Sequence, residues 1–379
     1  MTDSLSRRRL LAYRMLASGL ARTTAKVADL PIWDIGLQDR DGWAALALAA
    51  RVPRPELDRW LGGRQLGEPA AGTTFALVWS LRGSPHLHRR RDLQAVADAL
   101  WPADEKDALA RLVGSGKTLV ANGSTGLDGY RVVAAAMRAV VTGTMRKPAA
   151  SAALTAALPS EFSAFCRPCG SVHVMEMLFR CAALPGGLGL IPEQSATLQP
   201  LRETIKQPTV QTGLDRLITA YLQLYGAATP SEVGAHLGTT AAQIKRSWPD
   251  TEAITIDGTT LQATPVDADA VRATDIEATA DIVRLLPPGD PLLQPRERAL
   301  LIEDKAAWKM LWPAIGPAGA VVAGGAIAAA WRPKKVGSKL TINITEFEPL
   351  TAEQRSSVET EAELMAAVRR VDAVQVSFG

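Results

Sequence analysis

This chain of 379 residues has few cysteines, a small net charge and no long run of strongly apolar residues. Its three cysteines are too few for the disulfide framework of a secreted protein, so a reducing compartment fits best. The formal net charge of +3 is too small to identify a nucleic-acid partner by itself. The charge-free run at residues 314–330 is too short and too rich in Gly and Ala for a membrane span, and fits a buried hairpin better.

Length and composition favour an ordinary multidomain protein. The chain is longer than one hydrophobic core usually supports, and its 47% hydrophobic and 21% charged residues exclude a largely disordered chain. The segment SRRRLL at residues 6–11 resembles a twin-arginine export signal, but Arg14 interrupts the apolar run that such a signal requires. We therefore expect a cytoplasmic protein without membrane contact.

Four polar residues in a row, Gln38, Asp39, Arg40 and Asp41, precede a predicted helix at residues 43–51. We call them the polar cluster. Unpaired N–H groups and the positive dipole end of that helix would point into the polar cluster, which favours a site. The alternative is that the two aspartates only cap the helix and solubilise a surface turn, as Asp commonly does before a helix.

The clearest local pattern lies at residues 214–263. An amphipathic helix is followed by a capping box, TPSE at residues 229–232, and by a third short helix that begins near Thr240. Alternating residues around Asp257 and Gly258 then predict a hairpin. Three helices and a hairpin are typical of a winged helix, whose third helix would present Gln243, Lys245 and Arg246 outward to a major groove. The alternative is a module that only packs or dimerises.

The rest of the chain gives a coarser prediction. Residues 5–21, 92–101, 130–141 and 149–158 have helical patterns, the third apolar nearly all round and therefore internal, and residues 75–81 predict a buried strand. Five short strands are predicted toward the C-terminus, enough for a small β-barrel, at residues 282–286, 299–302, 320–323, 327–331 and 340–345. A final helix with solvated charges opens with a capping box at Thr351 and Gln354.

Cys166, Cys169, His173 and Cys181 have spacings that could nominally supply four zinc ligands. A structural zinc site usually brings two paired ligand motifs, and only one Cys-x-x-Cys pair is present. We therefore expect small buried thiols and a hydrogen-bonded histidine, with no metal and no cofactor.

Basic residues gather in two runs that either contact a phosphate backbone or form a solvated surface. The second run comprises Arg332, Lys334, Lys335 and Lys339. The first run contains Arg82, His86, Arg89, Arg90 and Arg91.

Three segments together resemble one protein family. They are RGSPHL at residues 82–87, LLPPGDPLL at residues 285–293 and WRP at residues 331–333, and their order along the chain also matches. The chain is similar to the bacterial winged-helix DNA-binding proteins related to the AlkZ and YcaQ DNA glycosylases. The resemblance implies a mainly α fold with β structure: three tandem winged-helix units in a C shape around duplex DNA, plus a C-terminal β-barrel. The corresponding domains are residues 1–90, 91–200, 209–270 and 280–379.

The resemblance also implies an activity. Family members of known activity remove cationic alkylated purines, including those in interstrand crosslinks, and their catalytic motif is Gln, an apolar residue, then Gln or Asp. That motif falls on Gln38, Asp39 and Arg40, of which only Gln38 matches. Arg40 cannot accept a proton, so Asp39 or Asp41 must supply the carboxylate, and Arg40 more naturally holds a phosphate.

Two functions follow from this comparison. The first is a DNA glycosylase acting on alkylated or bulky-adduct purines in double-stranded DNA, with Gln38 placing the water. The second is a winged-helix DNA-binding protein without catalysis, such as a damage sensor or transcription regulator. In either case we expect Arg82, His86, Arg89, Arg90 and Arg91 to contact the DNA backbone. We also expect a cytoplasmic, nucleoid-associated monomer.

Overall fold

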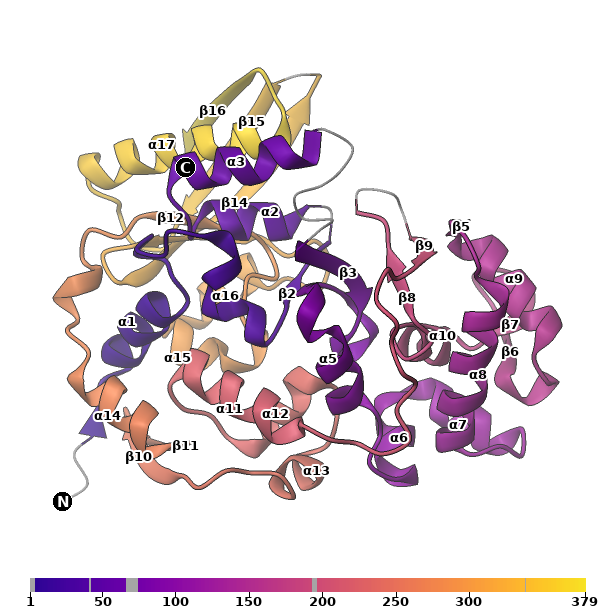
Figure 1. Cartoon of the computed structure of the whole chain (residues 1–379). Helices are drawn as coiled ribbons and strands as arrows, with labels where there is room; N and C mark the ends of the chain where they lie inside the picture. Colours follow the sequence, from indigo (N-terminus) through magenta and orange to yellow (C-terminus); the bar gives the residue numbers. More distant parts are fainter. Residues whose placement is uncertain (1–3, 41, 66–73, 193–195, 338) are drawn as a thin grey trace. The chain divides into compact units, whose positions relative to one another are not determined.

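The computed structural model describes residues 4–40, 42–65, 74–192, 196–337 and 339–379 (Figure 1). Its contacts group the chain into two compact units. The first comprises Met1–Ala70, Ala220–Thr229 and Asp250–Gly379, and the second comprises Ala71–Thr219 and Pro230–Pro249. The division into four domains stays a prediction.

The first unit is built on a five-stranded sheet and helices from both ends of the chain. Its helices are α1 (Arg7–Ala17), α2 (Trp43–Ala49), α3 (Arg54–Gln65), α14 (Pro265–Ala273), α15 (Arg298–Leu301), α16 (Lys305–Leu311) and α17 (Ala352–Arg369). The sheet strands are β12 (Arg284–Leu286), β13 (Gly319–Ala323), β14 (Ala326–Val336), β15 (Lys339–Glu346) and β16 (Ala373–Phe378), in that order. The first four pair antiparallel, and β16 joins β15 in parallel after the α17 crossover.

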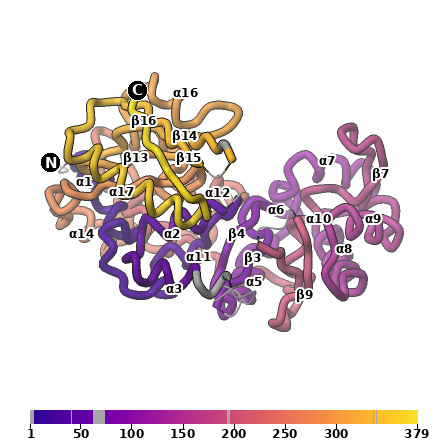
Figure 2. Tube along the Cα trace, turned by 90° about the horizontal axis from the view of Figure 1, so that it is seen from above, coloured from indigo at the N-terminus to yellow at the C-terminus, as the bar shows by residue number. Residues whose placement is uncertain are grey.

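Both faces of this sheet are apolar, and each is covered by helices. Val321 of β13 packs in one cluster with Val358 of α17 and Leu46 of α2. The next residue, Val322, points to the other face and packs with Met15 of α1. The helix α17 packs beside β16, as Figure 2 shows, and it also contacts β12. The predicted barrel is therefore wrong: among the described strands no pairing joins β12 to β16, because helices bury both faces and the sheet need not curl over itself.

Three further local predictions concern this unit. Residues 299–302, predicted as a strand, belong largely to the helix α15, in which Leu301 is buried. The capping box of α17 is confirmed, since Thr351 and Gln354 exchange both hydrogen bonds. The predicted hairpin is also confirmed: β10 (Glu252–Ile256) and β11 (Thr259–Ala263) pair antiparallel across Asp257 and Gly258, and β1 (Ser4–Leu5) adds to β10 in parallel.

The second unit combines short strands with a helical layer. Its helices are α5 (Leu93–Leu100), α6 (Glu105–Arg111), α7 (Gly114–Ala121), α8 (Gly126–Val140), α9 (Lys147–Ala157), α10 (Glu176–Ala183), α12 (Pro230–Leu237) and α13 (Ala241–Lys245). Residues of α11 (Leu214–Tyr225) belong to both units. The strands are β3 (Phe75–Trp79), β4 (Pro85–Arg89), β5 (Met145–Arg146), β6 (Ser163–Cys166), β7 (Ser171–Val174), β8 (Leu188–Leu190) and β9 (Thr197–Pro200).

Strand β3 forms the centre of this unit, as its continuous apolar sequence predicts. All five of its residues are buried, and the strand order around it is β4-β3-β8-β9-β5. Val78 packs with Leu93 and Val96 of α5. The helix α8 differs from its prediction as an internal helix: Tyr130 and Val133 face the core, but Arg131 and Arg138 are exposed, so the helix is amphipathic.

Candidate active site

Gln38 ends a short strand, β2 (Leu37–Gln38), just before helix α2, and its side chain is partly buried. Gly42 is the N-cap of α2 and adopts a left-handed φ of 79°, which glycine tolerates. Because glycine has no side chain, it cannot cap the helix by a side-chain hydrogen bond. Asp39 performs that task, because its Oδ1 accepts the Ala44 backbone N–H at 3.1 Å. The polar cluster therefore lies at a helix N-terminus as predicted, and its Asp39 has the capping role. Asp41 lies outside the described residues.

The segment at residues 285–293, which we call the proline-glycine segment, passes directly beside this helix start. A Cβ added to Gly289 would lie 2.8 Å from the Trp43 ring and 3.9 Å from Gln38 Oε1. Gly289 also has a φ of +79°, so both space and backbone conformation require glycine here. The Gln38 amide and the Trp43 ring are thus brought together against one backbone turn.

A buried ion pair fixes the proline-glycine segment to the other end of α2. The guanidinium of Arg51 donates to both carboxylate oxygens of Asp290 at 2.7 Å, and both side chains are 0% exposed. Arg51 also donates to the carbonyls of Ser18 and Ala47, while Asp290 accepts the backbone N–H of Leu292. The polar groups of this pair are therefore well satisfied away from water.

Further hydrogen bonds fix the backbone of the same segment. Tyr225 Oη donates to the carbonyl of Pro291 at 2.6 Å, and Trp331 Nε1 donates to the carbonyl of Leu286 at 2.8 Å. Trp331 begins the WRP segment, so two of the three segments that carry the family resemblance meet here. Sequence reasoning found these segments but missed Arg51, because nothing local marks a residue whose partner lies 239 positions away.

Arg40 differs from its neighbours in being exposed. Its guanidinium carbon lies 5.9 Å from the centre of the Trp43 ring, within the range of a cation–π contact. A guanidinium there can attract an anion but cannot accept a proton from water.

The residues predicted to contact DNA from the run at 82–91 have unequal surroundings. His86 is 2% exposed, and burial, followed by the nearby Arg82 charge, lowers its pKa well below the usual value. A neutral, buried imidazole cannot offer charge to a phosphate, so this expectation for His86 is wrong. Arg82 donates to the carbonyl of His236.

The three consecutive arginines also differ. Arg89 pairs with Asp92 at 2.6 Å and Arg90 with Glu203 at 2.8 Å, and both arginine side chains are largely covered. The side chain of Arg91 is 73% exposed, and its Nε lies 3.8 Å from Asp92 Oδ1, which is a longer separation than in the other two pairs. Of these three, Arg91 is best placed to meet an external phosphate.

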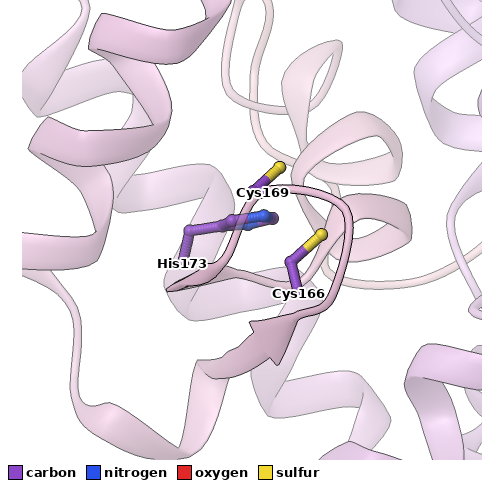
Figure 3. Close-up of side chains that lie close together, drawn as sticks. All are labelled: Cys166, Cys169 and His173. Atoms are coloured by element: carbon purple, nitrogen blue, oxygen red, sulfur yellow. The ribbon is translucent and has the colours of Figure 1, made fainter.

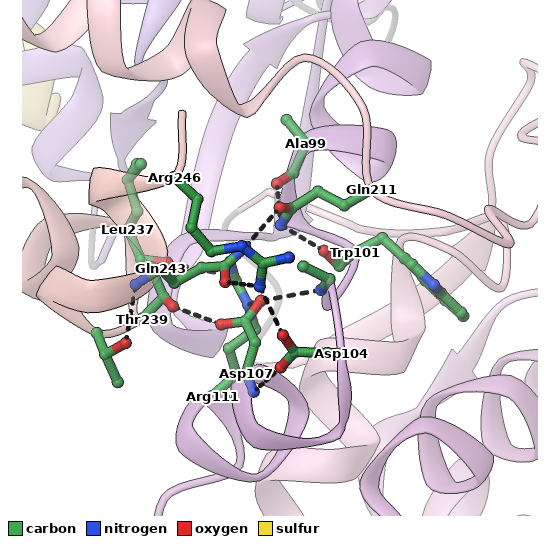
Figure 4. A network of polar contacts seen from close by, with 12 residues as sticks. Ala99, Trp101, Asp104, Asp107, Arg111, Gln211, Leu237, Thr239, Gln243 and Arg246 are labelled. Atoms are coloured by element: carbon green, nitrogen blue, oxygen red, sulfur yellow. Dashed lines mark hydrogen bonds and ion pairs between the residues drawn. The ribbon is translucent and has the colours of Figure 1, made fainter. Parts of the chain in front are cut away.

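Gln243 was expected on the outer side of its helix, but it is 6% exposed and lies in a polar network of the second unit (Figure 4). Its Nε2 donates to Gln211 Oε1 at 3.0 Å, and its Oε1 accepts from Arg246 at 2.9 Å. Arg246 also pairs with Asp104 at 2.6 Å. The prediction for Gln243 is therefore corrected: its amide is used to join α13 to the Gln211 segment. Lys245 is exposed.

A separate cavity of about 30 Å³ lies in the second unit, lined by Arg82, Arg111, Tyr130 and Cys181 among others. This volume holds roughly two water molecules and no nucleobase.

None of the helices in the described part of the chain has the length and apolar character of a membrane span.

The cysteines also depart from expectation. Cys169 is exposed and Cys166 only half-buried, whereas both were predicted as buried thiols. Figure 3 shows that the side chains of Cys166, Cys169 and His173 lie close together around the turn between β6 and β7. Their possible ligand atoms lie within 4.8 Å of one another. These three residues could hold a metal ion.

Comparisons with known proteins can now be set beside this geometry. Residues 35–368 match the model of the protein family described as DNA glycosylase AlkZ-like. Among solved structures, the Streptomyces sahachiroi DNA glycosylase AlkZ is similar with a TM-score of 0.72 at 19% sequence identity, over 99% of this chain and 100% of that chain. A search of curated protein sequences gives no match. At this identity the structural likeness shows a shared fold.

Proposed function

The chain belongs to the AlkZ-like DNA glycosylase family, and on this premise we propose that it hydrolyses the N-glycosidic bond of alkylated or bulky-adduct purines in duplex DNA. The observation that carries the proposal is the position of Gln38. Its amide lies at a helix N-terminus, partly buried, against the proline-glycine segment. Release of an adducted base from one strand would also unhook an interstrand crosslink.

The chemistry of this substrate class suits a site with few ionisable groups. An N-alkylated purine already carries positive charge and departs readily, so little general acid is needed. The site must hold a water molecule in place and stabilise an oxocarbenium-like sugar. The Gln38 side chain can orient that water, since an amide both donates and accepts hydrogen bonds.

A carboxylate next to Gln38 would accept the water proton and offset the sugar cation. Asp39 is adjacent, and the hydrogen bond from Ala44 fixes the orientation of its carboxylate. This preorganisation supports Asp39 in the role. Asp41 is the alternative carboxylate.

Arg40 supports a different step, the binding of DNA. Its exposed guanidinium beside Trp43 suits a phosphate near the extruded nucleotide. We further propose that α11 to α13 with the β10–β11 hairpin form a winged helix, and that Arg91 and Lys245 contact the duplex backbone. Such a protein would act on the nucleoid in the cytoplasm, as a monomer.

A second candidate function is DNA binding without base excision. Two features favour it. Arg40 stands where family members of known activity carry a Gln or Asp, and the Asp39 carboxylate already accepts a hydrogen bond as a helix cap. In that function Gln38 would contact the DNA backbone.

The two functions are separated by incubating the protein with duplex DNA that contains an N7-alkylguanine and measuring abasic sites under single-turnover conditions. We expect Gln38→Ala to lower the rate by roughly 100-fold or more. Asp39→Asn keeps an oxygen for the Ala44 N–H but removes the charge, so it separates chemistry from capping, and Asp39→Ala removes both. Gln375→Ala, at an exposed position on β16, is the matched control and should be unchanged.

DNA affinity measured on the same variants completes the design. Arg91→Ala should weaken binding and reduce the salt slope by about 1, while Gln38→Ala should bind normally. Lesion binding without any abasic product would support the second function. Product formation that survives both Gln38→Ala and Asp39→Asn would place the chemistry elsewhere.

A further inference from the structure

The strands β6 and β7 form a small hairpin in the second unit with an exposed turn. Ala164 pairs with His173 and Cys166 with Ser171, so these four side chains share one face of the hairpin. Cys166 and His173 are diagonal neighbours on that face, within reach of each other. The turn brings back Cys169, because Gly170 adopts a φ of +62° and its N–H donates to the Cys166 carbonyl at 2.9 Å.

A local hydrogen bond orients His173 as a ligand. His173 Nδ1 lies 2.8 Å from the carbonyl of Val174, which can only accept, so Nδ1 carries the proton and Nε2 is left for another partner. A histidine that donates one ring N–H to a backbone carbonyl is the usual arrangement at metal sites.

The arrangement points to a soft divalent cation: we propose that Cys166, Cys169 and His173 bind one Zn²⁺ ion. Two sulfur atoms and one imidazole nitrogen select zinc over magnesium or calcium, which prefer oxygen. In a tetrahedral zinc site the ligand atoms are about 3.6–3.8 Å apart, and here they lie within 4.8 Å. Closure by about 1 Å, within reach of side-chain rotation, completes the coordination.

Water is the natural fourth ligand. Within the described residues the cluster has three members, and Cys169 is exposed to solvent. The hairpin packs against α9 through β7, but toward its turn it exposes Phe165 and Val172 on its other face, so an ion that joins the turn to both strands would stabilise this exposed end. We therefore assign the ion a structural role in this hairpin, which goes beyond the proposed glycosylase function and does not depend on it.

The test uses the full-length protein purified with a phosphine reductant. We expect one equivalent of zinc by mass spectrometry, and Co²⁺ substitution should give thiolate charge-transfer bands together with the visible bands of a tetrahedral ion. Cys166→Ser and His173→Gln should each weaken zinc binding by roughly 100-fold or more. Cys169→His keeps a ligand at that position and should retain zinc.

Cys181→Ser is the matched control, because Cys181 lies outside the cluster on α10, and it should bind zinc normally. The cobalt spectrum of the wild-type protein does not depend on any variant folding. The proposal is overturned by a wild-type protein without stoichiometric zinc or cobalt–thiolate bands. It is also overturned by zinc that the double variant of Cys166 and Cys169 retains, or by a disulfide between the two cysteines under reducing conditions.

Discussion

The Arg51–Asp290 ion pair allows a quantitative test of what holds Gln38 in position. Asp290→Ala leaves the Arg51 guanidinium buried without its counter-charge, because both side chains are 0% exposed. Removing one partner of a buried pair costs about 3–5 kcal/mol. For a folded unit of this size, such a loss lowers the melting temperature by roughly 6–20 °C.

The measurement is urea unfolding followed by tryptophan fluorescence, with the free energy compared between variants. Asp58→Ala is the matched control, since it removes a carboxylate from the Arg54–Asp58 pair, whose side chains are 50% and 51% exposed. That change should cost less than about 1 kcal/mol. The double change Arg51→Met with Asp290→Leu removes both charges and should recover much of the loss.

Two results would refute the reasoning. If Asp290→Ala costs no more than Asp58→Ala, the pair does not carry the stability assigned to it. If the apolar double variant is as unstable as Asp290→Ala, the loss does not come from an unpaired buried charge. We also expect Asp290→Ala to lower base excision, because Asp290 adjoins the Gly289 turn beside Gln38.

Two further predictions concern pH and backbone space. Burial lowers the pKa of His88 to about 4 in the folded protein, whereas the pKa in the unfolded chain is about 6.5. As pH falls below about 6.5, His88 is therefore protonated in the unfolded chain but not in the folded protein, and stability is lost progressively toward pH 4. The contribution of His88 to the unfolding free energy should be about 2 kcal/mol smaller at pH 5 than at pH 7.5, and a His88→Gln variant with the same pH dependence as the wild-type protein would contradict this. Gly289→Ala and Gly42→Ala share a φ of +79° and hence similar strain, but only at Gly289 does a Cβ meet Trp43. Gly289→Ala should therefore lose more stability and excision activity, and equal effects would show that the contact is unimportant.

Sequence predicted best what local chemistry decides. The Thr351 capping box and the turn at Asp257 and Gly258 use bonds between residues a few positions apart, so their patterns are legible in the chain. The buried strand β3 was equally clear, because a continuous apolar run bounded by glycine has few other structures available.

Sequence failed where a distant partner decides the outcome. Gln243 faces inward because Gln211 and Arg246 offer hydrogen bonds to its amide, and no pattern within α13 shows this. His86 stands in a basic run, yet the fold buries it. Four of the five predicted C-terminal strands correspond to β12, β13, β14 and β15, while residues 299–302 are largely helical and β16 was not predicted. Helices on both faces keep these strands in an open sheet, and local periodicity does not show what packs on a sheet.

The same distinction explains why the resemblance was clear in the proline-glycine segment and weak at the polar cluster. In that segment the structure constrains three consecutive residues. Gly289 leaves room for the Trp43 ring, the Asp290 carboxylate pairs with the Arg51 guanidinium, and the Pro291 carbonyl accepts a hydrogen bond from Tyr225. Arg40 is placed differently: its side chain is exposed and its guanidinium lies beside the Trp43 ring. The contacts that hold the proline-glycine segment beside Gln38 are made by Trp43, Arg51 and Tyr225. It follows that the decisive measurements are chemical ones on Gln38 and Asp39, since the fold that supports them is compatible with either function.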